Sequence, residues 1–231
     1  MTPAAIYDVV FAAKDYAGEA EHVHRIVQER LPGAASLLDV ACGTGRHLEQ
    51  LRRWYTVEGL DLDPAMLERA RERLQNVPLH EGDMRSFDLG RKFDAVTCLF
   101  SSIAQVRTGD GLRDAARAMG RHLRPGGVLV VEPWISPDEH AAHGEPWVEL
   151  FEQPGVKVAV METSTLEGRL WIEDAHYLVW TSEGIEHLQE REATGAFRHE
   201  HHLAAFRDAG LAVDHDPVGL TGRGLYLSVR R

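Results

Sequence analysis

The stretch SLLDVACGTG, residues Ser36–Gly45, decides the fold of this chain. Its first half, Ser36 to Val40, is the near-continuous apolar run that is typical of a parallel strand covered on both faces. Two glycines, Gly43 and Gly45, follow at once, and glycine permits backbone angles and a close ligand approach that larger residues do not allow. A helix is expected directly after them. This order of strand, glycine turn and helix predicts a loop that binds a nucleotide-type cofactor.

A carboxylate further along the chain supports this interpretation. Asp61 ends a second expected strand in TVEGLDLD, where it can accept hydrogen bonds from both hydroxyls of a ribose. Ligands of an open parallel sheet bind beyond the carboxyl ends of its strands, so the loops after neighbouring strands come together. The loop after the third strand brings Asp83, which can accept from the exocyclic amine of adenine. It also brings Met84, which can sandwich a flat base together with Leu62. The side chains of these loops can therefore bind the ribose and the adenine of an adenosine.

Helical and strand patterns alternate along the chain. Helices are expected at Asp15–Arg30, Arg46–Trp54, Pro64–Leu74, Gly111–Leu123 and His199–Ala209. Strands are expected at Ser36–Val40, Thr56–Leu60, Val77–His80, Phe93–Ser101, within RPGGVLVVEPW, at Ala212–Val218 and at Gly224–Arg230. We therefore predict an α/β fold with a doubly wound, mostly parallel seven-strand sheet.

The pattern changes after Trp134. Alternating segments joined by short Glu-Gly turns predict an antiparallel insertion after the fifth strand, from Pro137 to Arg191. We expect a single domain over residues 1–231, with the subregion 137–191 as a lid over the substrate. An edge strand of this insertion also offers a surface for a homodimer.

The composition argues against several classes of function. With 25 basic and 36 acidic residues the net charge is −11, which would repel a nucleic-acid backbone or an anionic membrane. The two cysteines, Cys42 and Cys98, are too few for a disulfide framework and are expected to be small buried fillers. The N-terminus does not resemble a secretion signal, so a cytoplasmic location is expected. Three histidines, His199, His201 and His202, would diverge on a solvated helix face, so no metal site is expected.

A nicotinamide dinucleotide would also bring an adenosine to such a loop. Its pyrophosphate requires a G-x-G-x-x-G sequence, whereas this chain has GTGRHL, in which Leu48 replaces the third glycine. A nicotinamide-dependent oxidoreductase therefore stays as an alternative. A non-catalytic module that binds a cofactor or dimerises is the second alternative.

The spacing and the whole set of loops resemble the S-adenosylmethionine-dependent methyltransferases of class I, the seven-strand class. The match is closer to a subgroup that includes the N,N-dimethyltransferases of nucleotide-linked 3-amino-6-deoxysugars. The motifs that carry this resemblance, from about Tyr7 to the C-terminus, are YDVV, KDY, LLDVACGTG, VEGLDLD, HEGDMR, DAVTCLFSSI, VVEPW, HYLV and GRGL. The resemblance implies that S-adenosyl-L-methionine is the cofactor.

The resemblance also implies roles for particular residues. Tyr7 would lie close to the methionine end of the cofactor, and Arg223 would lie on the substrate side. With the glycine loop included, the expected cofactor contacts are Tyr16, Asp39, Ala41, Gly43, Gly45, Asp61, Leu62, Asp83, Met84 and Leu99.

The substrate side departs from the subgroup. Its members have a histidine at the position of Gln105, and glutamine cannot act as a base. They also have two tryptophans where this chain has EPWI, which contains only Trp134. They also carry a tyrosine that would fall before Met1. The substrate-side candidates are therefore Tyr7, Gln105, Trp134 and Arg223.

Methyl transfer from a sulfonium depends mainly on the alignment of the reacting atoms. Aromatic faces from Tyr7, Tyr16, Phe100 and Trp134 can stabilise the positive sulfur. Water or a carboxylate such as Glu132 can take the proton of an amine acceptor. The sequence thus predicts a methyltransferase that acts on an N or O atom of a small molecule, for which a nucleotide-linked amino sugar is one candidate.

Overall fold

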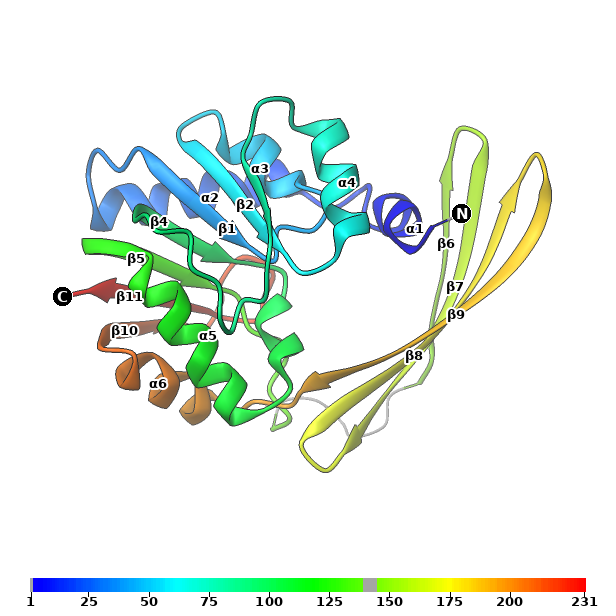
Figure 1. Ribbon diagram of the computed structural model, residues 1–231. Helices are drawn as coiled ribbons and strands as arrows, with labels where there is room; N and C mark the ends of the chain where they lie inside the picture. The colour runs from blue at the N-terminus through cyan, green and yellow to red at the C-terminus, as the bar shows by residue number, and fades with distance from the viewer. Residues whose placement is uncertain (1, 139–144) are drawn as a thin grey trace.

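The computed structural model describes residues 2–138 and 145–231 of the chain, which form two sheets and the helices around them (Figure 1). The helices are α1 (Pro3–Val10), α2 (Tyr16–Arg30), α3 (Arg46–Leu51), α4 (Pro64–Arg73), α5 (Gly109–Arg121) and α6 (His199–Asp208), with a 3₁₀ helix η1 (Ser102–Val106). The strands are β1 (Ser36–Val40), β2 (Thr56–Asp61), β3 (Leu79–Glu81), β4 (Phe93–Cys98), β5 (Leu123–Val131), β6 (Trp147–Gln153), β7 (Val156–Glu167), β8 (Leu170–Thr181), β9 (Gly184–Gly195), β10 (Leu211–Asp216) and β11 (Leu225–Arg230).

The main sheet has the strand order β10-β11-β5-β4-β1-β2-β3. β1 pairs in parallel with β2 on one side and with β4 on the other, whereas β11 runs antiparallel to both β5 and β10. The predicted doubly wound, mostly parallel seven-strand sheet is confirmed. The strand order reverses between β1 and β4, so the carboxyl ends of these two strands border the crevice in which such sheets bind ligands.

Two apolar clusters cover the two faces of this sheet. Alternate residues of β1 show the division, because Leu38 and Val40 belong to one cluster and Leu37 to the other. The first cluster packs the sheet against α5 and α6, and the second packs it against α2, α3 and α4 (Figure 1). This covering on both faces explains why the strand sequences are apolar without alternation.

Local signals set the starts of the helices. The side chain of Asp63 accepts a hydrogen bond from the backbone of Ala65, and Pro64 occupies the first position of α4. The same signals are present at α1, where Thr2 is the cap and Pro3 follows. α1 was nevertheless not among the expected helices, because its eight residues contain too few turns to display a clear period.

The four strands from Trp147 to Gly195 form a second, antiparallel sheet with the order β6-β7-β8-β9. Part of the predicted insertion, residues 139–144, lies outside the described residues. α1 lies between this sheet and the rest of the chain (Figure 1). The residues at this apolar contact are Ile6, Val9 and Val10 of α1 and Val156, Val158, Val160 and Val179 of the sheet.

Two expectations need correction. β4 ends at Cys98 and not at Ser101, because Phe100 and Ser101 have φ angles of 51° and 64°, which a strand cannot accommodate. The histidines of α6 do not share a solvated face, because His202 is 2% exposed and packs against the ring of Tyr226. Burial, together with neighbouring histidines, lowers the pKa of His202 to about 3, so this ring is neutral in the folded protein.

Within the described residues, none of the helices has the length and apolar character that a membrane span requires.

Candidate functional site

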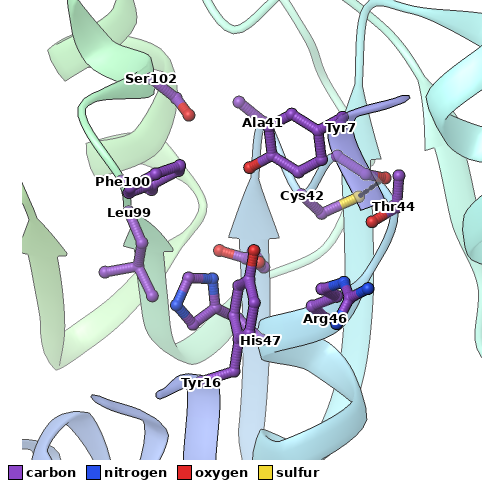
Figure 2. A pocket seen from close by; sticks show the side chains of 12 residues that line it. Tyr7, Tyr16, Ala41, Cys42, Thr44, Arg46, His47, Leu99, Phe100 and Ser102 are labelled. Atoms are coloured by element: carbon purple, nitrogen blue, oxygen red, sulfur yellow. Dashed lines mark hydrogen bonds between the residues drawn. The ribbon is translucent and has the colours of Figure 1, made fainter. Parts of the chain in front are cut away.

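A cavity opens at the carboxyl ends of β1 and β4, where the strand order of the main sheet reverses. Figure 2 shows side chains from α1, α2, the loop after β1, α3 and the loop after β4 converging on it. It is lined by Tyr7, Tyr16, Asp39, Ala41, Cys42, Gly43, Thr44, Arg46, His47, Leu99, Phe100 and Ser102. The structure therefore brings together the predicted residues Tyr7, Tyr16, Asp39, Ala41, Gly43 and Leu99.

The loop after β1 owes its shape to left-handed backbone angles. Ala41, Gly43 and Gly45 have φ angles of 57°, 55° and 79°. A Cβ at Gly43 would meet no atom within 4 Å, so this glycine borders open space in the cavity. A Cβ at Gly45 would lie 2.6 Å from Cδ1 of Leu74, so this glycine is required for α3 to pack close to α4. One glycine leaves room beside the loop and the other allows its helix to pack.

Asp39 lies at the base of the cavity and is 2% exposed. One of its oxygens accepts a hydrogen bond from Oγ1 of Thr97 at 2.7 Å. Burial raises the pKa of this carboxyl to about 6, although the nearby His47 acts in the opposite direction. His47 is held in turn by Oε2 of Glu19, 2.8 Å from its Nε2 atom. A cationic group in the cavity would therefore face a buried carboxyl group that accepts a hydrogen bond from Thr97.

Two tyrosines close the cavity from the helical side. Tyr16 is 7% exposed, and burial raises its pKa to about 12, so it is a neutral hydrogen-bond donor. Its ring meets that of His47 edge to face, with 4.8 Å between centroids. Its hydroxyl is buried and has no well-formed hydrogen bond among the described residues, although the hydroxyl of Tyr7 is close enough to affect its pKa. A buried donor of this kind requires an acceptor, which a bound ligand can provide.

The predicted adenosine contacts lie beside the cavity, at the ends of β2 and β3, and do not line it. Asp61 accepts hydrogen bonds from the backbone N–H of Gly43 at 2.7 Å and of Asp63 at 2.9 Å. Leu62 is 63% exposed. Asp83 is paired with Arg85 of its own loop, and hydrogen bonds from Arg85 hold its pKa below the ordinary value. Met84, also half-buried, packs on the edge of the core.

The predicted substrate side begins at Phe100. The guanidinium of Arg223 lies over the rings of Phe100 and Trp134, 5.2 and 4.9 Å from their centroids. Its Nη1 atom donates to Oγ of Ser101 at 3.1 Å. Gln105 is exposed on η1 and does not line the cavity. The structure thus places Arg223 and Trp134 together beside the cavity and leaves Gln105 outside it.

Glu132, which sequence considerations offered as a proton acceptor, has another role. It is fully buried, and its two oxygens accept hydrogen bonds from the backbone N–H of Phe100 and from the hydroxyl of Thr221. It therefore joins the loop after β4 to the loop before β11. Because Glu132 is fully buried and does not line the cavity, an acceptor amine in the cavity would not reach it.

Sequence reasoning did not assign Ser102 or Cys42 to the site, although both line the cavity, and it missed a group of three further lining residues, Thr44, Arg46 and His47. They surround Gly45, at the point where the glycine loop enters α3. The signal was present, because the first turn of the helix after such a loop faces the ligand site. Both cysteines are buried, as expected, and burial raises the pKa of each thiol. In residues 2–138 and 145–231, no three His, Cys, Asp or Glu side chains are arranged so that they could hold a metal ion.

Comparisons with known proteins agree on one chemistry. A family model described as a methyltransferase domain matches residues 37–127. Over 98% of its length the chain is 43% identical to the dTDP-4-amino-2,3,4,6-tetradeoxy-D-glucose N,N-dimethyltransferase of Saccharopolyspora spinosa, and it covers 92% of that protein.

Two solved structures extend the likeness to three dimensions. The crystal structure of Streptomyces venezuelae DesVI matches all of this chain and 99% of its own, with a TM-score of 0.96 and 40% identity. CalS10 with bound S-adenosylmethionine, an amino pentose methyltransferase from Micromonospora echinaspora, matches with a TM-score of 0.90 and 41% identity. That match covers 98% of this chain and 97% of CalS10.

Proposed function

The chain belongs to the S-adenosylmethionine-dependent methyltransferases, and from this premise we propose that it methylates the amine of a nucleotide-linked amino sugar. The observation that carries the proposal is the likeness over nearly the whole chain to proteins named for such acceptors, a dTDP-linked amino sugar in one case and an amino pentose in another. Because the likeness includes the second sheet as well as the main one, it covers more than the part that binds the cofactor.

The cofactor is S-adenosyl-L-methionine, which supplies a methyl group on a positively charged sulfur. The residues of the cavity fit it. Among the described residues the buried hydroxyl of Tyr16 has no well-formed partner, open space borders Gly43, and Asp39 offers a buried carboxylate. We assign the methionine end to Tyr7, Tyr16 and Asp39. The adenosine end is assigned to Asp61, Leu62, Asp83 and Met84, with Ala41, Gly43, Gly45 and Leu99 between the two.

The inner face of the second sheet supports an amine as acceptor. Glu162 and Glu173 lie on the face that packs against α1, because side chains two apart along a strand share a face. Burial raises the pKa of Glu173 to about 7, and the charges of Glu162 and Glu192 contribute to this rise. The nearby Arg223 acts in the opposite direction. An ammonium beside these carboxylates would be attracted, and a carboxyl with such a pKa can receive the proton that the ammonium must lose.

Arg223 supports the nucleotide part of the proposal. Its guanidinium lies on two aromatic rings and donates to Ser101, which fixes its plane beside the cavity. A planar guanidinium binds a phosphate or a carboxylate through two parallel hydrogen bonds. We therefore assign Arg223 to the diphosphate of the acceptor, with Trp134 as its support. The second sheet then acts as the lid, and Tyr7 and Phe100 exclude water from the reacting atoms.

A panel of acceptors tests this proposal. The purified protein is incubated with S-adenosylmethionine and, separately, with nucleotide-linked amino sugars, free amines and small carboxylates, and S-adenosylhomocysteine is measured by mass spectrometry. A nucleotide-linked sugar with a hydroxyl in place of the amine is the matched control. The proposal expects product with the amino sugar and none with the control. Product with the carboxylates but not with the amino sugar would contradict it.

We also propose that the protein is a homodimer that uses the outer face of the second sheet. This face carries large apolar side chains that are between 44% and 71% exposed, namely Val148, Leu150, Met161, Leu178, Trp180 and Ile185. A patch of this kind on a soluble protein marks an interaction surface. We take a second copy of the chain as the partner, because it presents the same apolar strands in the same order. A cytoplasmic location is part of the proposal and fits the two free cysteines.

A further inference from the structure

A buried carboxylate on α1 holds the cofactor loop from outside the cavity. Asp8 is 6% exposed and does not line the cavity. Its Oδ1 atom accepts from Oγ1 of Thr44 at 2.8 Å and from Nε of Arg46 at 2.9 Å. Its Oδ2 atom accepts from Nη2 of Arg73 at 2.9 Å and more weakly from Arg69 at 3.4 Å. One side chain thus connects α1 with the glycine loop, with α3 and with α4.

These hydrogen bonds form a closed ring around the loop. Arg73 donates from Nε to the backbone carbonyl of Thr44 at 3.0 Å and from Nη2 to Asp8. Thr44 therefore meets Asp8 through its side chain and Arg73 through its backbone. Burial tends to raise the pKa of Asp8, but hydrogen bonds from Arg46, Arg73 and Thr44 prevail and lower it. These donors therefore favour the charged form of the carboxylate.

The loop inside this ring needs external support. Ala41 has a φ angle of 57°, which a residue other than glycine keeps only where its surroundings hold it, and the two glycines on either side of Thr44 leave the backbone there conformationally free. Thr44 lies between the two glycines and is 1% exposed. The side chains of Asp8 and Arg73 both hold Thr44 by hydrogen bonds.

Asp8 also determines what α1 presents to the cavity. Its neighbour Tyr7 lines the cavity and packs on Phe11, with 4.7 Å between ring centroids, and Phe11 meets Phe100 at 5.0 Å. The apolar side of the same helix packs on the second sheet. If α1 moved away, the cavity would lose Tyr7, and the glycine loop would lose the carboxylate that holds Thr44.

We propose that Asp8 is a positioning residue for methyl transfer, through which the docking of α1 and the binding of the cofactor become one event. The carboxylate locks the glycine loop in its binding shape only while α1 is docked. A cofactor in the cavity, which Tyr7 of α1 and Gly43 of the loop both line, would in turn retain the helix. No atom of Asp8 needs to touch the cofactor or the acceptor in this role.

The isosteric variant Asp8→Asn tests the proposal through cofactor binding alone. Its amide keeps the size of the carboxylate, but its single acceptor oxygen cannot serve the four donors, which are three guanidinium groups and the hydroxyl of Thr44. We expect the dissociation constant for S-adenosylmethionine, measured by calorimetry, to rise roughly tenfold or more, as the loss of charged hydrogen bonds implies. In wild-type protein, the cofactor should slow amide hydrogen exchange in residues 3–10, and in Asp8→Asn this protection should be lost.

Two controls separate positioning from general instability. Phe206→Leu removes buried volume from the fully buried contact of α6 with the sheet, away from the cavity, and lowers stability without touching α1. Asp110→Asn removes one surface carboxylate from α5. Both variants should bind the cofactor as the wild type does, measured well below their melting temperatures.

A double variant tests whether Asp8 acts on cofactor binding through Thr44. Thr44→Val removes one donor to the carboxylate of Asp8, so its effect and that of Asp8→Asn should not add when the two are combined. The proposal is overturned if Asp8→Asn binds the cofactor with wild-type affinity, or if Phe206→Leu weakens binding as much as Asp8→Asn. It is also overturned if the cofactor protects α1 equally in wild-type protein and in Asp8→Asn.

Discussion

The carboxylate of Asp61 accepts a hydrogen bond from the backbone N–H of Gly43 at 2.7 Å. This contact ties the end of β2 to the glycine loop that follows β1, so the two parts of the predicted adenosine site are built as one unit. It engages one carboxylate oxygen, and the other accepts from the backbone of Asp63 at 2.9 Å. Each oxygen keeps a further lone pair for a ribose hydroxyl.

The variant Asp61→Asn should weaken cofactor binding. Its amide nitrogen cannot accept from a ribose hydroxyl or from Gly43, so we expect a loss of about 1–3 kcal/mol of binding free energy. Calorimetric titration with S-adenosylhomocysteine measures this loss. Asp63→Asn, in the same loop, is the matched control and should bind normally, because asparagine also caps helices. Equal affinity of wild type and Asp61→Asn would remove Asp61 from the site.

The affinity for the cofactor should depend on pH through Asp39. Burial raises the pKa of this carboxyl to about 6, so it is mostly neutral at pH 5 and mostly charged at pH 7. The positively charged methionine amine of the cofactor prefers the charged form. We therefore expect binding to strengthen as the pH rises from 5 to 7, and to lose most of this dependence in Asp39→Asn. A pH dependence that is the same in both proteins would contradict the assignment.

The raised pKa of Asp39 should also make the free energy of unfolding fall as the pH rises, whereas cofactor binding strengthens. In the unfolded chain a carboxyl of this kind takes up its proton near pH 4, whereas Asp39 in the folded protein does so near pH 6. Between these values the folded state binds more protons, so the free energy of unfolding should fall as the pH rises through this window. The contribution is about 2–3 kcal/mol by the usual conversion. Urea unfolding of wild type and Asp39→Asn at pH 4.5 and 7 measures it, and an equal difference between the two proteins at both pH values would contradict the prediction.

Replacement of Arg223 should affect the acceptor and spare the cofactor. Arg223→Lys keeps the charge but loses the planar guanidinium that lies over Phe100 and Trp134. We expect KM for the nucleotide-linked acceptor to rise at least roughly tenfold, as the loss of a charged bidentate contact implies, with an unchanged Kd for S-adenosylmethionine. Steady-state kinetics and calorimetry measure the two quantities. A change in cofactor affinity alone would show that Arg223 lies on the wrong side of the reaction.

The oligomeric state should depend on the outer face of the second sheet. Leu178 on β8 is 51% exposed, and Leu178→Lys would place a charge in the centre of a dimer contact on this face. Light scattering should then give a dimer for the wild type and a monomer for the variant. Val218→Lys, at a 68% exposed apolar side chain outside this sheet, is the control and should remain dimeric. A dimeric Leu178→Lys would place the interface elsewhere.

The main sheet was predictable because its signals are local. The apolar run from Ser36, the cap at Asp63 and the alternation of strand and helix each act within a few residues, and together they specify an α/β fold. α1 was missed because its apolar residues Ile6, Val9 and Val10 span too short a segment to show the repeat of a helix. Its helical state depends on the sheet that covers these side chains, which lies more than a hundred residues away in the sequence.

The same distinction applies to the candidate site. The glycine loop and the carboxylate of Asp61 follow directly from strand ends, so the sequence indicates where they lie. Arg46, His47 and Asp8 depend on partners in other elements: Arg46 on Asp8, and His47 on Glu19. Gln105 was considered because it stands where the resembling subgroup has a histidine, but its exposure on η1 is decided by the packing of that helix, which no local pattern displays.

The measurement that tests the central claim most directly is the position of the transferred methyl group. The protein is incubated with S-adenosylmethionine labelled with ¹³C in its methyl group and with a dTDP-linked amino sugar, and the product is examined by NMR and fragment mass spectrometry. The account predicts labelled carbon on the amine nitrogen, together with an equivalent amount of S-adenosylhomocysteine. Label on a hydroxyl oxygen, or no label on the sugar while the cofactor binds normally, would contradict it.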